Sequence, residues 1–236
     1  MNPDAAYVVD FDGTITTLDI STELALYYGS SVFMEIENSY RHREIPIQVW
    51  LQRIVKLLPA DMEQLRTKAL GWAVIRPGFE RFLEHARTHG RPVIVASDGF
   101  GFYVEPILEK HGLLEQINYI YRNDIFINPK NNLEVINPHA HKICTICGNC
   151  KAAHVVRQKE KGLSVIYIGD GSNDRFGASW SDHVCARDEL AEACREYNLP
   201  YSQWNDFYDI IKVERPGFSD RSEDSLCCPL GSGIKS

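Results

Sequence analysis

Acidic side chains follow three short apolar segments of this chain. The segments end in the sequences Asp10-Phe11-Asp12-Gly13-Thr14, Ser97-Asp98-Gly99 and Gly169-Asp170-Gly171-Ser172-Asn173-Asp174. Carboxylates that converge in one cleft repel each other and raise each other's pKa values unless a cation neutralises them. All-oxygen ligation with few protein ligands suits Mg²⁺. If the three segments meet in space, their chemistry is that of an acidic site that works with a divalent cation.

The apolar segments before these acids have the pattern of buried strands in a parallel sheet. They are β-branched runs at residues 7–11, 92–97 and 164–169. Helical patterns at residues 77–89 and 151–161 precede the last two runs, and each ends in a glycine placed as a C-cap. Functional residues of such sheets gather at the carboxyl ends of the strands. The sequence therefore predicts an α/β fold with a doubly wound parallel sheet that brings the acids together.

The same patterns divide the chain into parts. Residues 1–16 and 76–213 form the predicted α/β catalytic core, and residues 17–75 have helical signals only, which indicates a helical cap inserted after the first acidic segment. Within residues 119–137, two runs of alternating residue type flank a turn that contains Asn and Pro, so a hairpin insertion within the core is expected. Residues 214–236 are rich in Ser, Asp, Gly and Pro and are expected to form a flexible tail.

Composition excludes several classes of function. The chain has 236 residues, and 25 Lys and Arg against 32 Asp and Glu give a net charge of −7, which disfavours a nucleic-acid partner. With 44% hydrophobic and 24% charged residues, the chain is expected to fold as a globular protein. Its apolar stretches fall short of the ~20 residues that span a bilayer, and residues 1–10 have no signal-peptide pattern. We therefore expect a cytoplasmic protein without a membrane partner.

In their order along the chain, the acidic segments resemble the motifs of the haloacid dehalogenase superfamily. Its first motif, a D-x-D-x-T strand end, is matched by residues 10–14, and its second, a Ser or Thr at a strand end, by Ser97. Its third, a Lys that opens a helix, is matched by Lys151, and its fourth, an acidic loop, by residues 170–174. The resemblance extends over roughly residues 5–210. It implies a Rossmann-like core with an inserted helical cap.

The resemblance also implies an Mg²⁺-dependent phosphomonoester hydrolase that forms an aspartyl-phosphate. Asp10 would be the nucleophile, and Asp12 would protonate the leaving alcohol and then activate water. Because dehalogenases of the superfamily lack this second Asp, phosphoester cleavage is favoured over carbon–halogen cleavage. Mg²⁺ would be held by Asp10, the backbone carbonyl of Asp12 and Asp170, with Thr14 and Asp174 in support, and the phosphate would be bound by Ser97, Asp98, Gly99 and Lys151.

One residue departs from the pattern of the superfamily. Phosphoserine phosphatases and methionine salvage phosphatases usually have Gly after the serine of the second motif, where this chain has Asp98. A carboxylate directed at the phosphate would repel it. We therefore expect the Asp98 side chain to point away from the ligand, with only its backbone N–H nearby.

The helical insertion is typical of the phosphoserine phosphatase branch, in which the cap contacts the rest of the substrate. Residues 100–108 and 147–151 resemble the methionine salvage phosphatases that act on 2-hydroxy-3-keto-5-methylthiopentenyl-1-phosphate. A cysteine-flanked Lys also occurs in phosphoethanolamine and phosphocholine phosphatases, but these have Glu at the position of Gly13. The expected substrate is thus the salvage intermediate. The alternatives are phosphoserine, phosphocholine or phosphoethanolamine, or a catalytically silent protein that binds a phosphometabolite.

Three cap residues are candidates for substrate contacts. Asp19 and Glu23 fall near the position where phosphoserine phosphatases have a Glu that recognises the substrate amine. Arg53 falls near their carboxylate-binding Arg. Each of the three could equally belong to a solvated helix face.

A run of three cysteines, Cys144, Cys147 and Cys150, follows His139 and His141. Three thiolates and one imidazole could hold a structural zinc. The usual zinc pattern has two separated pairs, however, and here one cysteine directly precedes Lys151 of the proposed phosphate site. A zinc or iron–sulfur centre and a reduced, packed loop are both open, and we expect the second.

Overall fold

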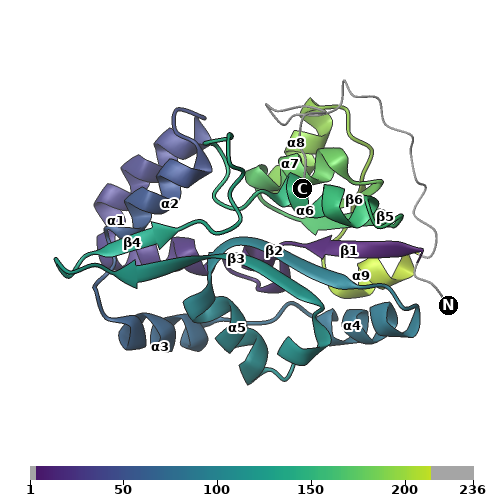
Figure 1. Ribbon diagram of the computed structural model, residues 1–236, viewed down its shortest axis with the longest axis horizontal. Helices are drawn as coiled ribbons and strands as arrows, with labels where there is room; N and C mark the ends of the chain where they lie inside the picture. Colours follow the sequence, from purple (N-terminus) through teal and green to yellow (C-terminus); the bar gives the residue numbers. More distant parts are fainter. Residues whose placement is uncertain (1–3, 214–236) are drawn as a thin grey trace.

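The computed structural model describes residues 4–213, which form one seven-stranded sheet with helices on both faces (Figure 1). The strands are β1 (Ala5–Val9), β2 (Val93–Phe100), β3 (Tyr119–Ile127), β4 (Leu133–Ile136), β5 (Ser164–Gly169), β6 (His183–Ala186) and β7 (Ser202–Gln203). They follow the order β4-β3-β2-β1-β5-β6-β7, and only the pair β3–β4 is antiparallel. The predicted doubly wound parallel sheet is confirmed. The expected tail at 214–236 lies outside the described residues.

Helices cover both faces of this sheet, as Figure 1 shows. The helices of the described residues are α1 (Ile20–Arg41), α2 (Ile47–Val55), α3 (Met62–Trp72), α4 (Phe79–Thr88), α5 (Gly101–Lys110), α6 (Lys151–Lys159), α7 (Arg175–Trp180), α8 (Asp188–Glu196) and α9 (Phe207–Lys212). All five residues of the central strand β1 are buried, which explains its continuous apolar sequence. The C-cap predictions are confirmed, because Gly90 and Gly162 have φ angles of 67° and 79° after α4 and α6.

Strand β3 differs from the simple inserted hairpin that residues 119–137 suggest. Its first part pairs in parallel with β2, with Ile94 opposite Tyr119, and its last part pairs antiparallel with β4, with Ile127 opposite Leu133. β3 is therefore a strand of the main sheet, and it continues past the end of β2 to pair with β4. Most residues of β3 are half-buried or exposed, so it lacks the continuous apolar run by which buried parallel strands are recognised.

The helices α1, α2 and α3, called the cap below, are joined to the rest of the structure by two chain segments that lie side by side. The outgoing and returning chain segments meet in a bridge between Thr16 and Ile75, where the Thr17 N–H donates to the carbonyl of Val74 at 2.9 Å. Helical patterns at residues 21–28 and 31–41 suggest two helices, but the structure has the single helix α1, kinked at Gly29 (φ −144°, ψ 42°). In Figure 1, α1 and α2 lie on one side of the β3–β4 extension and α3 lies on the other.

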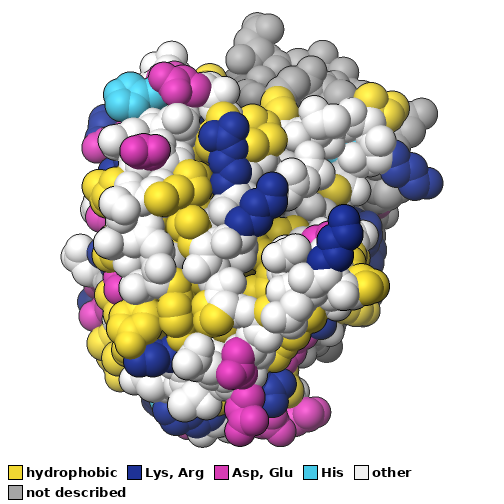
Figure 2. Space-filling view, turned by 90° about the vertical axis from the view of Figure 1, so that its left-hand side faces the viewer, with side chains coloured by type: hydrophobic (Ala, Val, Ile, Leu, Met, Phe, Trp, Pro, Cys, Tyr) yellow, Lys and Arg dark blue, Asp and Glu magenta, His cyan; other side chains and the backbone are white. Residues whose placement is uncertain are grey.

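The surface at the cap end carries exposed hydrophobic side chains. Figure 2 shows them in yellow among scattered basic and acidic side chains. On α1 they include Tyr27, Val32 and Met34, which are 58%, 49% and 50% exposed. None of the helices in residues 4–213 combines the length and the apolar character that crossing a bilayer requires.

Candidate active site

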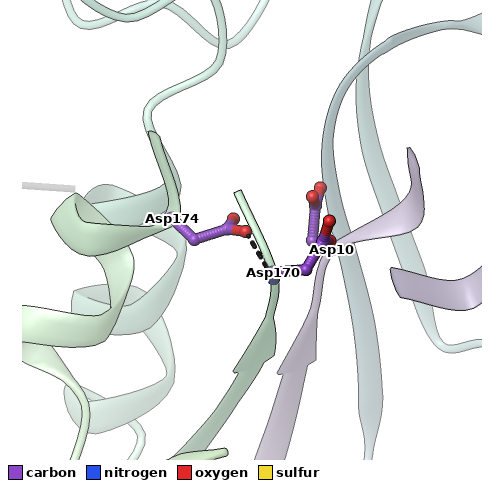
Figure 3. Close-up of side chains that lie close together, drawn as sticks. All are labelled: Asp10, Asp170 and Asp174. Carbon is purple, nitrogen blue, oxygen red and sulfur yellow. Dashed lines mark hydrogen bonds between the residues drawn. The ribbon is translucent and has the colours of Figure 1, made fainter. Parts of the chain in front are cut away.

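The strand ends bring Asp10 and Asp170 together. β1 and β5 are parallel neighbours with Val9 opposite Ile168, so the residues that follow them leave the sheet at the same edge. Figure 3 shows the two carboxylates side by side, with Asp174 reaching back toward the backbone of Asp170. One oxygen from each of the three aspartates lies within 4.8 Å of the others. The convergence expected from the sequence is therefore present for the first and last acidic segments.

Lys151, the first residue of α6, lies between two of these carboxylates. Its side chain is 3% exposed, and Nζ donates to Oδ1 of Asp10 at 2.8 Å and to Oδ1 of Asp174 at 2.6 Å. Burial by itself would lower the pKa of Lys151, but the charges of Asp10 and Asp174 outweigh it and raise the pKa well above its usual value. Lys151 is therefore a fixed buried cation at the carboxyl edge of the sheet.

Asp174 has hydrogen-bond donors on both oxygens. Besides Lys151, Oδ1 accepts from the Tyr167 hydroxyl at 2.7 Å, and Oδ2 accepts from the backbone N–H groups of Asp170 at 3.1 Å and Gly171 at 2.9 Å. A carboxylate with four protein donors has little capacity left for a metal ion. Asp174 is thus suited to orient Lys151 and the loop that carries Asp170.

The carboxylates of Asp10 and Asp170 each keep one oxygen that accepts no hydrogen bond from residues 4–213. Lys151 contacts only Oδ1 of Asp10, and the Thr14 hydroxyl donates only to Oδ1 of Asp170. Burial, and next the charge of Asp174, raise the pKa of Asp10 well above its usual value and that of Asp170 to about 7. Two adjoining oxygen donors with disfavoured negative charge fit a hard divalent cation.

Asp12 leaves the same loop but has different partners. Its Oδ1 accepts from the backbone N–H of Ile20 at 3.0 Å, and its Oδ2 accepts from the hydroxyls of Tyr103 at 2.7 Å and Ser97 at 3.4 Å. Burial, and next the charge of Asp19, raise the pKa of Asp12 well above its usual value. A carboxyl group of raised pKa keeps its proton to a higher pH than an ordinary carboxyl group does, which suits a residue that gives a proton to a leaving group.

The second segment adds polar groups beside Lys151. Ser97 is fully buried, and its Oγ accepts from the backbone N–H of Gly99 at 2.8 Å. The expectation that Asp98 points away is wrong: its Oδ2 lies 3.6 Å from Nζ of Lys151, and the residue lines the same cavity as Asp10. Asn149 and Asn173 explain this orientation. The backbone N–H of Asn149 donates to Oδ1 at 3.1 Å and the Asn173 amide donates to Oδ2 at 2.5 Å.

Arg76 holds the loop that follows β1, and sequence reasoning missed it. Its buried guanidinium donates to the backbone carbonyls of Thr14 at 2.8 Å and of Gly13, and to that of Thr16 at 3.4 Å. Arginines are mostly exposed, so the sequence does not indicate that Arg76 is buried. The one available signal is its position, where the chain returns from the cap. Tyr103 was missed for a similar reason, since its contact to Asp12 joins residues 91 positions apart.

The cap forms the other wall of a cavity of about 290 Å³ above these acids. From the cap it is lined by Asp19, Ser21, Thr22, Glu37, Tyr40, Arg41, Ile47, Trp50 and Leu51. Of the three cap candidates, Asp19 lines this cavity and also caps α1 by accepting from the Thr22 N–H at 2.8 Å. Glu23 and Arg53 do not line it, and Arg53 is exposed. Glu37 is a second acid of the cap wall, and its carboxylate accepts from Arg41 at 2.7 Å and from the Trp50 indole at 2.9 Å.

The three cysteines of the run lie next to the site, and none of them is in a disulfide within residues 4–213. Cys147 and Cys150 are buried and Cys144 is half-buried. A hydrogen bond from the Cys147 thiol lowers the pKa of Cys144 to about 5. Within residues 4–213, the aspartate cluster is the one group of three or more His, Cys, Asp or Glu side chains close enough to share a metal ion. The cysteines and histidines of this run do not converge in that way.

Gly13→Ala is expected to destabilise the protein and to disturb the aspartate pair. Gly13 has a φ of 74°, and a Cβ at this position would overlap the carboxylate of Asp170. A left-handed conformation costs a non-glycine residue about 1–2 kcal/mol, so we expect the free energy of unfolding, measured with urea, to fall by at least that amount. Displacement of Asp170 should also raise the concentration of divalent cation needed for half-maximal activity.

Gly71→Ala is the matched control for this prediction. Gly71 lies in α3, and a Cβ there would meet no atom within 4 Å. Since Ala is favoured over Gly in helices by about 1 kcal/mol, this variant should be as stable as the parent or more stable. A Gly13→Ala protein with unchanged stability and cation requirement would contradict the assigned geometry.

Comparisons with known proteins relate the chain to phosphatases. Residues 6–198 match the model of a family described as Putative Phosphatase. The 2-hydroxy-3-keto-5-methylthiopentenyl-1-phosphate phosphatase of Bacillus cytotoxicus is 33% identical over 204 residues, covering 85% of this chain and 91% of that protein. The protein of the same name from Brevibacillus brevis is 30% identical over 207 residues, covering 86% and 92%. The bifunctional enzyme MtnB/MtnX of Bacillus licheniformis is 32% identical over 209 residues, but the chain spans about half its length, 48%.

Solved structures share the fold. A phosphoserine phosphatase described as a phospho-aspartyl intermediate analogue has a TM-score of 0.72 at 19% identity, covering 91% of this chain and 100% of that chain. A haloacid dehalogenase family hydrolase from Salmonella enterica has a TM-score of 0.71 at 17% identity, covering 91% and 73%. The haloacid dehalogenase fold expected from the four motifs is confirmed.

Proposed function

Because this chain belongs to the Putative Phosphatase family, we propose that it is an Mg²⁺-dependent phosphomonoester hydrolase acting on a small phosphometabolite. The observation that carries this proposal is the cluster of Asp10, Lys151 and Asp170 at the carboxyl ends of β1 and β5. It combines a buried carboxylate, a fixed cation and a second carboxylate. These are the groups that a phosphoryl transfer to a carboxylate requires.

The residues divide the reaction between them. The Asp10 carboxylate attacks phosphorus, the bond to the alcohol oxygen breaks, and Asp12 gives that oxygen a proton. Asp12 then takes a proton from water, which attacks the phosphorus of the aspartyl-phosphate and releases phosphate and free Asp10. Lys151 and the Ser97 hydroxyl are near enough to bind phosphate oxygens during both steps.

The acidic donor set supports Mg²⁺ as the cofactor. Asp10 and Asp170, with the backbone carbonyl of Asp12, would hold the ion, and Asp174 would support Lys151 rather than bind the metal itself. When bound, Mg²⁺ supplies positive charge to the phosphate oxygens. Lys151 alone cannot balance the four acids around it, which are Asp10, Asp98, Asp170 and Asp174.

The cavity supports 2-hydroxy-3-keto-5-methylthiopentenyl-1-phosphate as the substrate. That compound joins a phosphate and polar oxygens to an apolar methylthio tail. The cap wall offers polar groups at Glu37 and Arg41 and apolar side chains from α2, among them Ile47 and Trp50. Two relatives that align with this chain over about nine-tenths of their own length are named for this substrate.

Two observations disfavour the alternative substrates. Phosphocholine and phosphoethanolamine phosphatases have Glu where this chain has Gly13, and in this chain a Cβ at that position would overlap the carboxylate of Asp170. The carboxylate-binding Arg expected for a phosphoserine phosphatase would be Arg53, which is exposed and outside the cavity.

A phosphatase screen tests both the activity and the substrate. The panel contains the salvage intermediate, phosphoserine, phosphoethanolamine, phosphocholine and p-nitrophenyl phosphate, each assayed with Mg²⁺ and with EDTA. We expect hydrolysis that EDTA abolishes, and kcat/KM for the salvage intermediate at least about tenfold above the other metabolites, which corresponds to ~1.4 kcal/mol of transition-state discrimination. A lead for another metabolite would overturn the substrate, and no hydrolysis of any compound would leave a silent binding protein.

A further inference from the structure

The Tyr103 hydroxyl joins the cap to the proposed acid–base residue. Tyr103 lies on α5 and is fully buried, and its hydroxyl donates to Oδ2 of Asp12 at 2.7 Å and is 2.8 Å from Oγ of Ser21 on cap helix α1. We propose that Tyr103 is a positioning residue that holds the Asp12 carboxyl group in the orientation for proton transfer and connects it to the cap. This inference rests on the acid–base role of Asp12 in the proposed function.

The direction of the hydrogen bonds supports a relay from the cap to Asp12. Tyr103 has one hydroxyl proton, and it is given to Asp12, so Ser21 is the donor in the Ser21–Tyr103 pair. The other Asp12 oxygen accepts from the N–H of Ile20, the residue before Ser21. Both oxygens of Asp12 are therefore fixed by contacts that begin at the first turn of α1.

Core packing holds the Tyr103 ring independently of its hydroxyl. The ring contacts Phe102 edge-on at a centroid distance of 5.1 Å, Phe100 edge-on at 6.4 Å and Phe11 at 6.2 Å. A Cβ at Gly99 would overlap both the Tyr103 hydroxyl and the Asp12 carboxylate, so the strand passes this pair at the closest approach that glycine allows. Replacing Tyr103 by Phe should consequently keep the ring in place and remove the hydroxyl alone.

Tyr103 does not line the substrate cavity, so its effect should appear in proton transfer and not in binding. Loss of a hydrogen bond to an acid–base residue is expected to lower kcat/KM for an alkyl phosphate by about 10- to 100-fold. For p-nitrophenyl phosphate, the leaving group departs without a proton, and kcat/KM covers only the steps up to its departure. With this aryl phosphate kcat/KM should therefore remain within about twofold of the parent.

The experiment measures kcat/KM of Tyr103→Phe with the salvage intermediate as the alkyl phosphate and with p-nitrophenyl phosphate as the aryl phosphate. Tyr208→Phe is the matched control, because Tyr208 is 48% exposed on α9, and it should change neither value. Ser21→Ala removes the donor to Tyr103. Its loss of kcat/KM should be smaller than that of Tyr103→Phe and should likewise be larger for the alkyl phosphate than for the aryl phosphate. Circular dichroism and thermal melting verify that each variant is folded.

A double-mutant cycle with Asp12→Asn separates positioning from a general structural effect. If Tyr103 acts through Asp12, then Tyr103→Phe should cause no further loss of alkyl phosphate hydrolysis in the Asp12→Asn background. Equal losses for both substrates, or additive losses in the cycle, would overturn the inference while the phosphatase assignment stands. If Tyr103→Phe does not fold, Ser21→Ala provides the test. The inference is then overturned if this variant has the same ratio of kcat/KM for the alkyl phosphate to kcat/KM for the aryl phosphate as the parent. A parent protein that hydrolyses neither substrate instead contradicts the proposed function.

Discussion

Asp10→Asn is expected to abolish turnover and to prevent any covalent phosphoenzyme. An amide is a poor nucleophile, and no other carboxylate of residues 4–213 lies at the end of β1 in contact with Lys151. The fold should survive, because Lys151 keeps its 2.6 Å contact to Asp174 and the 3.6 Å contact to Asp98. The variant should therefore still bind inorganic phosphate.

Acid quenching after reaction with ³²P-labelled substrate measures this prediction directly. The parent protein should retain label in an acid-stable, hydroxylamine-sensitive form, as an acyl phosphate does, and Asp10→Asn should retain none. Asp209→Asn, at a surface position on α9, serves as the control for the loss of one carboxylate. Near-parental activity of Asp10→Asn would show that another residue is the nucleophile.

Asp12→Asn is expected to lower the rate by about 10²–10⁴, the range of general acid–base catalysis. An asparagine can still accept the hydrogen bond of the Ile20 N–H with its oxygen. Its amide NH2 would then face the Tyr103 hydroxyl, whose oxygen can accept from it, so the loop should keep its conformation. It can neither donate a carboxyl proton to the leaving group nor take one from water. With p-nitrophenyl phosphate the first step needs no proton, whereas the second still needs a base.

Asp12→Asn should consequently accumulate phosphoenzyme from the aryl phosphate. A rapid burst of p-nitrophenol followed by slow release of phosphate would be the kinetic signature of this block, and the labelled adduct should persist after quenching. Absence of a burst together with unchanged alkyl phosphate hydrolysis would exclude Asp12 as the acid–base residue. The contrast with Asp10→Asn, which should give no adduct, assigns separate steps to the two aspartates.

The sequence by itself determined the sheet and the positions of the acids along it. Parallel β-branched runs that end in polar residues specify the strands β1, β2 and β5 and the edge at which the chain leaves them. Glycines after α4 and α6 specify where these helices end. These features depend on local patterns and on the topology of a parallel sheet, so they can be inferred without coordinates.

Only the tertiary structure decided how the side chains around those acids are oriented. Asp98 faces Lys151 because amide donors from residues 149 and 173 hold it there, and Arg76 and Tyr103 act on loop residues that are far away in the sequence. Glu37 and Arg41 line the cavity in place of Glu23 and Arg53. The rotation of α1 and α2 about their axes decides which side chains of each helix face the cavity. Such contacts arise from packing between distant elements. The periodicity of one segment contains no information about the partner on which it packs.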